Sequence, residues 1–166
     1  MEQLNLFNPF QSENIEKPTS KIKIGVVGFS RNQFDKLEAT RKLKSILWTL
    51  AKDKNPQSFE LVSGYTASGV PKIAYILADE LGIETVGFSA KQALNVRNGV
   101  YPVKKVILVG QKFGDESEKF VEYIDILIRI GGGKQSRHEV TLFQKLHATD
   151  DLANLLFEEE VTWFGN

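Results

Sequence analysis

The chain has 166 residues, 42% of them hydrophobic and 10% aromatic, which suits one well-packed core and a single domain. Its 21 Lys and Arg balance its 21 Asp and Glu, so there is no overall basic field to hold nucleic acid. The absence of cysteine excludes disulfides, thiolate metal sites and cysteine nucleophiles, and makes the cytoplasm the expected location.

Residues 1–20 are expected to form an amino-terminal arm, and residues 21–166 the domain itself. The arm is rich in Asn, Gln, Ser and Pro, but four apolar residues between Leu4 and Phe10 favour docking on its own domain or on a neighbouring subunit. It lacks the charged and apolar regions of a secretory signal, and no later segment has the roughly 18 to 20 apolar residues of a membrane span. We therefore expect a soluble protein.

Strand and helix signals alternate along the domain. Short β-branched runs that end in glycine or polar residues predict strands, and apolar residues three and four positions apart predict amphipathic helices. The expected strands are Ile22–Gly28, Phe59–Gly64, Ile83–Phe88, Lys104–Gly110 and Ile124–Ile130. The expected helices span residues 34–50, 70–81 and about 116–123, a fourth begins near Ser136, and the end of the chain is read as a helix from Asp150 followed by a strand or an edge-covering tail.

Strands that alternate with helices in one domain predict an α/β fold, a three-layer Rossmann-like domain with a mostly parallel sheet of about five to six strands. Ligands of such sheets bind beyond the carboxyl ends of the strands, where the strand order reverses. The residues directly after each strand are therefore the ones to examine for function.

Three of these loops combine glycine with hydroxyl-bearing and basic residues. Glycines 131–133 let a ligand approach the main chain, and a helix that begins at Ser136 would direct free N–H groups at an anion. The loops after the first two strands repeat the pattern. The candidate ligand-binding residues are Gly28, Ser30, Arg31, Ser63, Gly64, Thr66, Ser68, Gly69, Asp115, Gly131, Gly132, Gly133, Lys134, Gln135 and Ser136.

Most of these candidates also have a purely structural explanation. Ser136 and Glu139 have the spacing of a capping box, which competes evenly with a ligand-facing role for Glu139. Asp115, Glu116 and Glu118 could bind a ribose hydroxyl or a metal, although Asp115 and Glu116 could merely favour a helix N-terminus. The loops indicate a site mainly in combination, because a parallel sheet places them side by side.

Several well-known sites are not supported by the motifs. The dinucleotide fingerprint G-x-G-x-x-G is absent after the first strand, and the P-loop pattern G-x-x-x-x-G-K-[ST] is absent too. No metal site is expected, because His138 and His147 lie nine residues apart and off any one helical face.

Three stretches carry a family resemblance. The segment GGGKQSRHE (residues 131–139) resembles the signature G-G-G-x-G-T-x-x-E, LVSGYTASGV (residues 61–70) is similar to the turn V-S-G-G-x-x-x-G-V, and VVGFS (residues 26–30) to a first-strand turn that ends in Ser. From Ile22 to Leu146 the chain thus resembles the SLOG superfamily of Rossmann-like proteins. That group includes the Lonely Guy phosphoribohydrolases, molybdenum-cofactor carrier proteins and the DNA-processing DprA proteins.

The resemblance implies a nucleotide or nucleotide-like phosphorylated ligand and a homodimer or larger homo-oligomer. The sequence departs from the signature where Gln135 replaces its second glycine and Ser136 its threonine. The Arg-Lys pair of the hydrolytic members falls on Glu116 and Ser117, which removes the arginine expected to hold the substrate phosphate. The resemblance therefore implies binding more firmly than cleavage.

Two functions from different classes stay open at this point. The first is a sensor, carrier or sequestering protein for a nucleotide-like ligand, which needs no catalytic group and no other cofactor. The second is a hydrolase of the N-glycosidic bond of nucleoside 5′-monophosphates, with Glu139 as the catalytic carboxylate and Arg31 or Lys134 holding the phosphate. An interaction subunit with a vestigial crevice is a third reading, and nucleic acid is not an expected partner because the net charge is zero.

Overall fold

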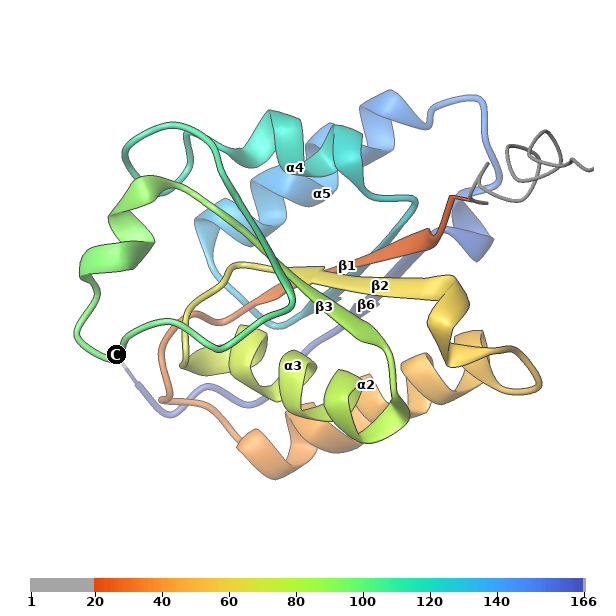
Figure 1. Ribbon diagram of the computed structural model, residues 1–166, viewed down its shortest axis with the longest axis horizontal. Helices are drawn as coiled ribbons and strands as arrows, with labels where there is room; N and C mark the ends of the chain where they lie inside the picture. The colour runs from red at the N-terminus through yellow and green to blue at the C-terminus, as the bar shows by residue number, and fades with distance from the viewer. Residues whose placement is uncertain (1–19, 166) are drawn as a thin grey trace, which may run out of the picture.

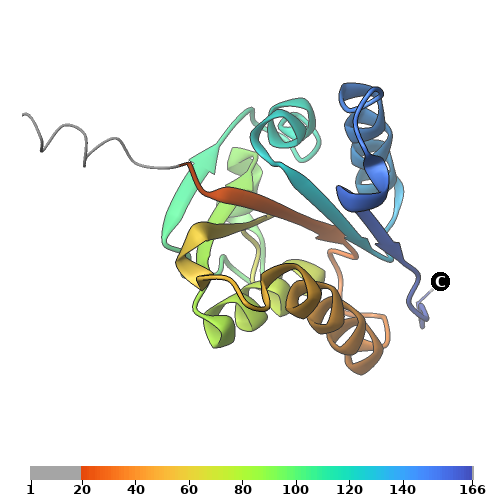
Figure 2. The ribbon, with the colours of Figure 1, turned by 90° about the vertical axis from the view of Figure 1, so that its right-hand side faces the viewer.

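The computed structural model describes residues 20–165, which form one α/β domain of three layers (Figures 1 and 2). A six-stranded sheet lies in the middle. Helices α2 (Lys36–Ala51) and α3 (Gly69–Leu81) cover one face, and α4 (Ser117–Tyr123) and α5 (Lys134–Leu146) cover the other. The predicted three-layer fold is confirmed, whereas the arm predicted over residues 1–20 lies almost wholly outside the described residues.

The strand order places the reversal of the sheet beside its first strand. The strands are β1 (Ile22–Gly28), β2 (Phe59–Ser63), β3 (Glu84–Ser89), β4 (Lys105–Leu108), β5 (Ile126–Ile130) and β6 (Leu156–Glu159). They lie in the order β4-β3-β2-β1-β5-β6, and each pairs with its neighbours in parallel. The chain builds outward from β1 to β4 and then crosses to the other side of β1, so a ligand is expected between the ends of β1 and β5.

Apolar periodicity explains how the layers hold together. Along α3, Val70, Ala74, Leu77 and Ala78 are buried against the sheet, and Gly82 ends the helix with a left-handed φ of 79°. Along α2, the side chain of Asp35 accepts a hydrogen bond from the N–H of Glu38 and caps the helix. Two apolar clusters result, one on each side of the sheet.

The carboxyl-terminal prediction needs a correction. Instead of an α-helix from Asp150, the structure has a short 3₁₀ helix, η3 (Leu152–Asn154), followed by β6 as a sixth strand. Two further 3₁₀ helices, η1 (Pro56–Ser58) and η2 (Lys91–Asn95), precede β2 and follow β3. Strand β6 pairs with β5 in register, with Arg129 opposite Glu158, so the end of the chain completes the sheet.

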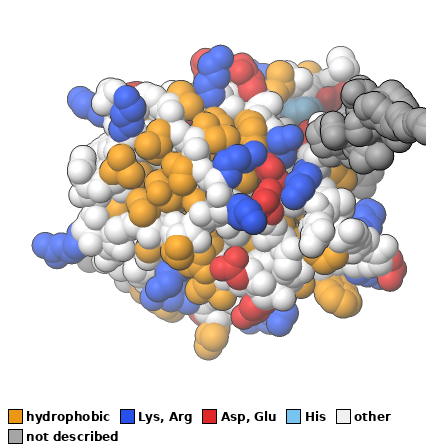
Figure 3. All heavy atoms as spheres, in the orientation of Figure 1, with side chains coloured by type: hydrophobic (Ala, Val, Ile, Leu, Met, Phe, Trp, Pro, Cys, Tyr) orange, Lys and Arg blue, Asp and Glu red, His pale blue; other side chains and the backbone are white. Residues whose placement is uncertain are grey.

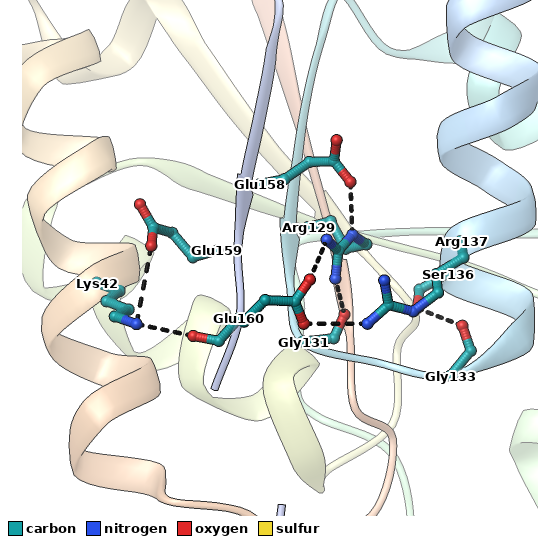
Figure 4. A network of polar contacts seen from close by, with 9 residues as sticks. All are labelled: Lys42, Arg129, Gly131, Gly133, Ser136, Arg137, Glu158, Glu159 and Glu160. Carbon is teal, nitrogen blue, oxygen red and sulfur yellow. Dashed lines mark hydrogen bonds and ion pairs between the residues drawn. The ribbon is translucent and has the colours of Figure 1, made fainter. Parts of the chain in front are cut away.

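A buried arginine joins the last strand to the loop that follows β5 (Figure 4). Arg129 is 4% exposed, and its guanidinium donates to Glu158 at 2.7 Å, to Glu160 at 2.8 Å and to the carbonyl of Gly131 at 2.8 Å. Arg137 on α5 binds Glu160 at 3.0 Å from the other side. The two arginines hold the pKa of Glu160 down at about 2. Arg129 therefore fixes the first glycine of the loop through a charge-assisted hydrogen bond.

We predict that Arg129→Met lowers the free energy of unfolding by about 2 kcal/mol, because the carbonyl of Gly131 loses a buried donor, Glu158 loses its partner and Glu160 keeps only Arg137. Arg137→Met is the matched control, since its side chain is half-exposed and shares Glu160, and it should cost less than about 1 kcal/mol. Urea denaturation followed by circular dichroism measures both values. Equal losses in the two variants would contradict the role given to Arg129.

Candidate functional site

A cavity of about 750 Å³ opens beyond the carboxyl ends of the central strands, at the reversal of strand order. Its walls come from the loops after β1 and β2, the end of β3, and the first turns of α4 and α5. In Figure 1 the carboxyl ends of the strands point to the left of the molecule. Figure 3, in the same orientation, shows hydrophobic side chains gathered on that left side. The cavity thus occupies the position that the topology predicts for a ligand.

Most of the residues singled out in the sequence meet at this cavity. Those that line it are Gly28, Ser30, Arg31, Ser63, Gly64, Thr66, Ser68, Gly133, Lys134, Gln135, Ser136 and Glu139. Four candidates lie outside its walls, namely Gly69, Asp115, Gly131 and Gly132. The loops therefore converge as expected, but not every residue in them faces the cavity.

The glycines outside the walls let main chains approach one another. A Cβ atom on Gly132 would lie 3.0 Å from the Cα of Gly28, so the loops after β1 and β5 touch backbone to backbone. A Cβ on Gly69 would meet the backbone of Phe29 and Ser30, and the φ of Gly69 is 64°. Glycine is needed at these positions because the main chains of the loops pack closely together. The sequence had instead suggested ligand contact as the reason for these glycines.

The first turn of α5 is open to an anion. Its N-cap is Gly133, and no acceptor within residues 20–165 binds the backbone N–H groups of Lys134, Gln135 and Ser136. The helix begins two residues earlier than the sequence predicts, so Ser136 does not cap it. The hydroxyl of Ser136 instead donates to the carbonyl of Gly133 at 3.1 Å. Free N–H groups and the helix dipole make this turn suitable for a phosphate.

The first turn of α3 is closed by the protein itself, which corrects the expectation for this loop. The N–H of Gly69 donates to the side chain of Asn32 at 2.8 Å, and the N–H of Val70 to the carbonyl of Phe29 at 2.7 Å. Ser68 makes no capping hydrogen bond, since its hydroxyl donates to the carbonyl of Ser30 at 3.1 Å. The first turn of α3 therefore offers no free N–H group of Gly69 or Val70 to an anion.

Glu139 belongs to a buried polar cluster and not to a capping box. It is 4% exposed, and one of its oxygens, Oε2, accepts from the hydroxyl of Ser117 at 2.8 Å and from the amide of Gln135 at 3.3 Å. The same amide nitrogen donates to Glu116 at 3.1 Å. Two carboxylates from α5 and the start of α4 are thus linked by one glutamine at the cavity wall.

Burial controls the protonation of this cluster. It raises the pKa of Glu139 to about 7, against the opposing effect of the hydrogen bonds from Ser117 and Gln135. Burial also raises the pKa of Glu116, although the N–H of Gly114 and the amide of Gln135 stabilise the carboxylate. The cavity therefore contains a carboxyl group that can exchange a proton near neutral pH.

Sequence reasoning selected the wrong member of the acidic pair before α4. Asp115 is exposed, and its carboxylate accepts from the N–H groups of Gln111 and Lys112, which holds the loop in shape and lowers its pKa. Glu116 is 4% exposed and lines the cavity. No local signal separates two adjacent acids, because the direction of each side chain depends on how α4 packs on the sheet.

Aromatic walls of the cavity were also missed. Trp163 stacks on Phe29 with ring centroids 4.8 Å apart, and Phe88, Phe113 and Phe120 line the cavity from other elements. Trp163 reaches this place because the segment after β6 forms an antiparallel bridge to Phe34. The sequence signal was limited to a Trp-Phe pair near the terminus, read as contact with a core or a partner.

Two site types find no support in the part of the chain that the structure describes. No group of three or more His, Asp or Glu side chains within residues 20–165 could hold a metal ion. No helix over the same residues has the length and apolar character needed to cross a membrane.

Solved structures of two other proteins have the same architecture. A molybdenum cofactor binding protein from the phototrophic bacterium Rippkaea orientalis has a TM-score of 0.60 at 21% identity, over 87% of this chain and 92% of that one. The molybdenum cofactor carrier protein from Chlamydomonas reinhardtii has a TM-score of 0.58 at 20% identity, over 83% and 89% of the two chains. This chain has the fold of those proteins. The three-layer Rossmann-like fold predicted from the sequence is confirmed.

Comparison by sequence adds nothing to this result. No model of a known protein family matches the chain, and no curated protein matches it. The similarity thus resides in the three-dimensional arrangement, and the function has to be argued from the site.

We predict that the free energy of unfolding falls by about 2 to 3 kcal/mol between pH 5 and pH 8, because the pKa of Glu139 is about 7 when folded and about 4.5 when unfolded. Between these values the folded state binds more protons, so stability is lost as the pH rises. Urea denaturation across the pH range should show a much flatter profile for Glu139→Gln. The exposed Glu80→Gln variant should keep the wild-type profile, and a flat wild-type profile would contradict the assignment.

Proposed function

We propose that this chain binds a nucleotide or nucleotide-like phosphorylated ligand in the cavity, as a carrier, sensor or sequestering protein. The observation that carries the proposal is the open first turn of α5 at the reversal of strand order, where three backbone N–H groups have no acceptor within the described residues. Such a turn offers hydrogen-bond donors and a positive dipole end to a phosphate.

The charges near this turn support the same placement. Lys134 is the first residue of α5 and lines the cavity, and Arg31 lines it from the loop after β1. The contact between Gly132 and Gly28 keeps these two loops together. A phosphate between them would meet backbone donors on one side and a guanidinium on the other.

The cavity is large enough for more than a phosphate. Its volume of about 750 Å³ is typical of a cofactor or nucleotide site, and its aromatic walls suit a planar ring. Two structural neighbours are named for binding or carrying the molybdenum cofactor. Their names support a carrier function for this chain in preference to the role of an interaction subunit. Homo-oligomerisation and a cytoplasmic location stay predictions from the resemblance and the composition.

A hydrolase of nucleoside 5′-monophosphates is the second candidate, and Glu139 favours it. Its carboxyl group is buried beside the proposed phosphate site, and its pKa of about 7 suits general acid or base catalysis at neutral pH. Against this, Glu116 and Ser117 stand where the resemblance places the arginine and lysine of hydrolytic members. Binding without cleavage is therefore the preferred proposal.

We predict that Lys134→Glu weakens ligand binding about tenfold, because it replaces a cation near the phosphate by an anion. Lys36→Glu is the matched control, since Lys36 is also the exposed first residue of a helix but lies outside the cavity walls. Trp48→Phe leaves Trp163 as the single tryptophan, so its fluorescence at the cavity reports titrations with mononucleotides, dinucleotides, cyclic nucleotides and molybdopterin. Equal affinities of the two lysine variants, or no binding of any ligand, would contradict the proposal.

For the hydrolase, the prediction is release of free base from AMP or CMP by the wild-type protein, measured by chromatography. Glu139→Gln should reduce the rate by about 10²- to 10³-fold, since removing one electrostatic group from a catalytic site costs about 3 to 4 kcal/mol of barrier. Glu80→Gln serves as the control. Unchanged turnover in Glu139→Gln would remove Glu139 from the mechanism, and no release by the wild-type protein would remove the hydrolase.

A further inference from the structure

The positions at which the chain departs from the family signature lie together in space. Glu116 and Ser117 replace the arginine and lysine that the resemblance implies, and Gln135 replaces a glycine. In the structure, Gln135 donates to Glu116 at 3.1 Å and to Glu139 at 3.3 Å, and Ser117 donates to Glu139 at 2.8 Å. These side chains form one acceptor cluster, consisting of Glu116, Ser117, Gln135 and Glu139.

With Glu139 ionised, every donor in the acceptor cluster is already in use. Both hydrogens of the Gln135 amide are directed at carboxylates, and the hydroxyl hydrogen of Ser117 is directed at Glu139. The unused groups are acceptors, namely Oε1 of Glu139 and the carbonyl oxygen of Gln135, which have no hydrogen-bond partner within residues 20–165. A ligand group that binds here must therefore donate hydrogen bonds.

The free acceptor belongs to a buried side chain at the cavity wall. Glu139 is 4% exposed and lines the cavity, and no Lys or Arg of the described residues forms an ion pair with Glu139 or Glu116. Burying such carboxylates without a cation is costly unless hydrogen bonds compensate. The acceptor cluster thus has capacity for further donors that the protein itself does not supply.

We propose that the acceptor cluster binds the hydrogen-bond-donor edge of a 2-amino-4-oxopyrimidine ring, the edge that guanine and pterins share. This inference rests on the proposed binding function and specifies the ring of the ligand. The edge carries a ring N–H beside an exocyclic amino group, two parallel donors that Oε1 of Glu139 and the carbonyl oxygen of Gln135 can accept. Adenine presents an acceptor at the corresponding ring nitrogen and fits poorly.

The surroundings of the acceptor cluster suit a flat ring. Phe88 and Phe120, with centroids 5.8 Å apart, line the same cavity as Glu116 and Glu139, and Phe113 lines it with a partly exposed side chain. Apolar faces with acceptors at one edge are the ordinary means of recognising a heterocycle. A ring bound here has its edge on the carboxylates and its faces on aromatic side chains.

The cluster also determines which way round the ligand lies. A phosphate at Glu116 and Glu139 would meet two carboxylates and no cation, whereas the first turn of α5 offers free N–H groups and Lys134. The phosphate therefore stays at α5 and the ring extends towards α4. In this orientation Glu116, Ser117 and Gln135 do not abolish ligand binding. They recognise the ring of the ligand at a place where the family signature would hold its phosphate.

The test compares ligands that differ at this edge in the Trp48→Phe protein, by fluorescence of Trp163 and by calorimetry. GMP should bind about 10- to 100-fold more tightly than IMP, which lacks only the 2-amino group, and than AMP. Pterin-6-carboxylate against lumazine-6-carboxylate, which has an oxygen in place of the amino group, repeats the comparison without ribose and phosphate. A preference for GMP over IMP without a preference between the two pteridines identifies a guanine nucleotide as the ligand. A preference for pterin-6-carboxylate over lumazine-6-carboxylate without one between the nucleotides identifies a pterin.

The variants separate this inference from the function on which it rests. Glu139→Gln should reduce the preference for GMP over IMP to less than about threefold, because it removes the negative charge that strengthens the hydrogen bond to Oε1. Glu118→Gln, an exposed acid on the same side of the molecule, should retain it. Equal binding of GMP, IMP and AMP that is weakened by Lys134→Glu would overturn the ring assignment and leave the phosphate site standing. Binding of none of the ligands would overturn both.

Discussion

The close backbone contact between the ends of β1 and β5 is the constraint on which the site depends. A Cβ on Gly132 would lie 3.0 Å from the backbone of Gly28, a Cβ on Gly28 would meet the carbonyl of Ile130, and Arg129 fixes the neighbouring Gly131 through its carbonyl. This contact places the open first turn of α5 opposite the loop after β1, at the one point where the sheet reverses its order. Without it, the free N–H groups of α5 would face no enclosed space.

The cavity has two chemically different sides. The first turn of α5 presents donors and a lysine, whereas the acceptor cluster presents carboxylates whose pKa values are raised by burial. A ligand with an acidic group at one end and a donor edge at the other matches both sides. The fold shared with molybdenum cofactor carrier proteins supplies the framework, and Glu116 and Glu139 give one side of the cavity its acidic character.

The sequence was a good guide to the layers and a weaker guide to the site. The burial pattern of α3 and the β-branched run of β1 predict their elements, because periodicity reports directly which face is buried. Strand β6 was missed as a definite element, since "LFEE" becomes a strand only by pairing with β5 and by its contact with Arg129. Likewise the start of α5 was misplaced, because Gly133 caps the helix without any side-chain signal.

By itself, the sequence determined the alternation of strands and helices, the parallel sheet and the loops that line the cavity. Those features follow from local periodicity and from glycine at strand ends. Only the tertiary structure decided which loop keeps its N–H groups free, that Asn32 closes the turn of α3, and that Glu116 and not Asp115 faces the cavity. Such choices depend on contacts between residues far apart in the chain, which no local pattern encodes.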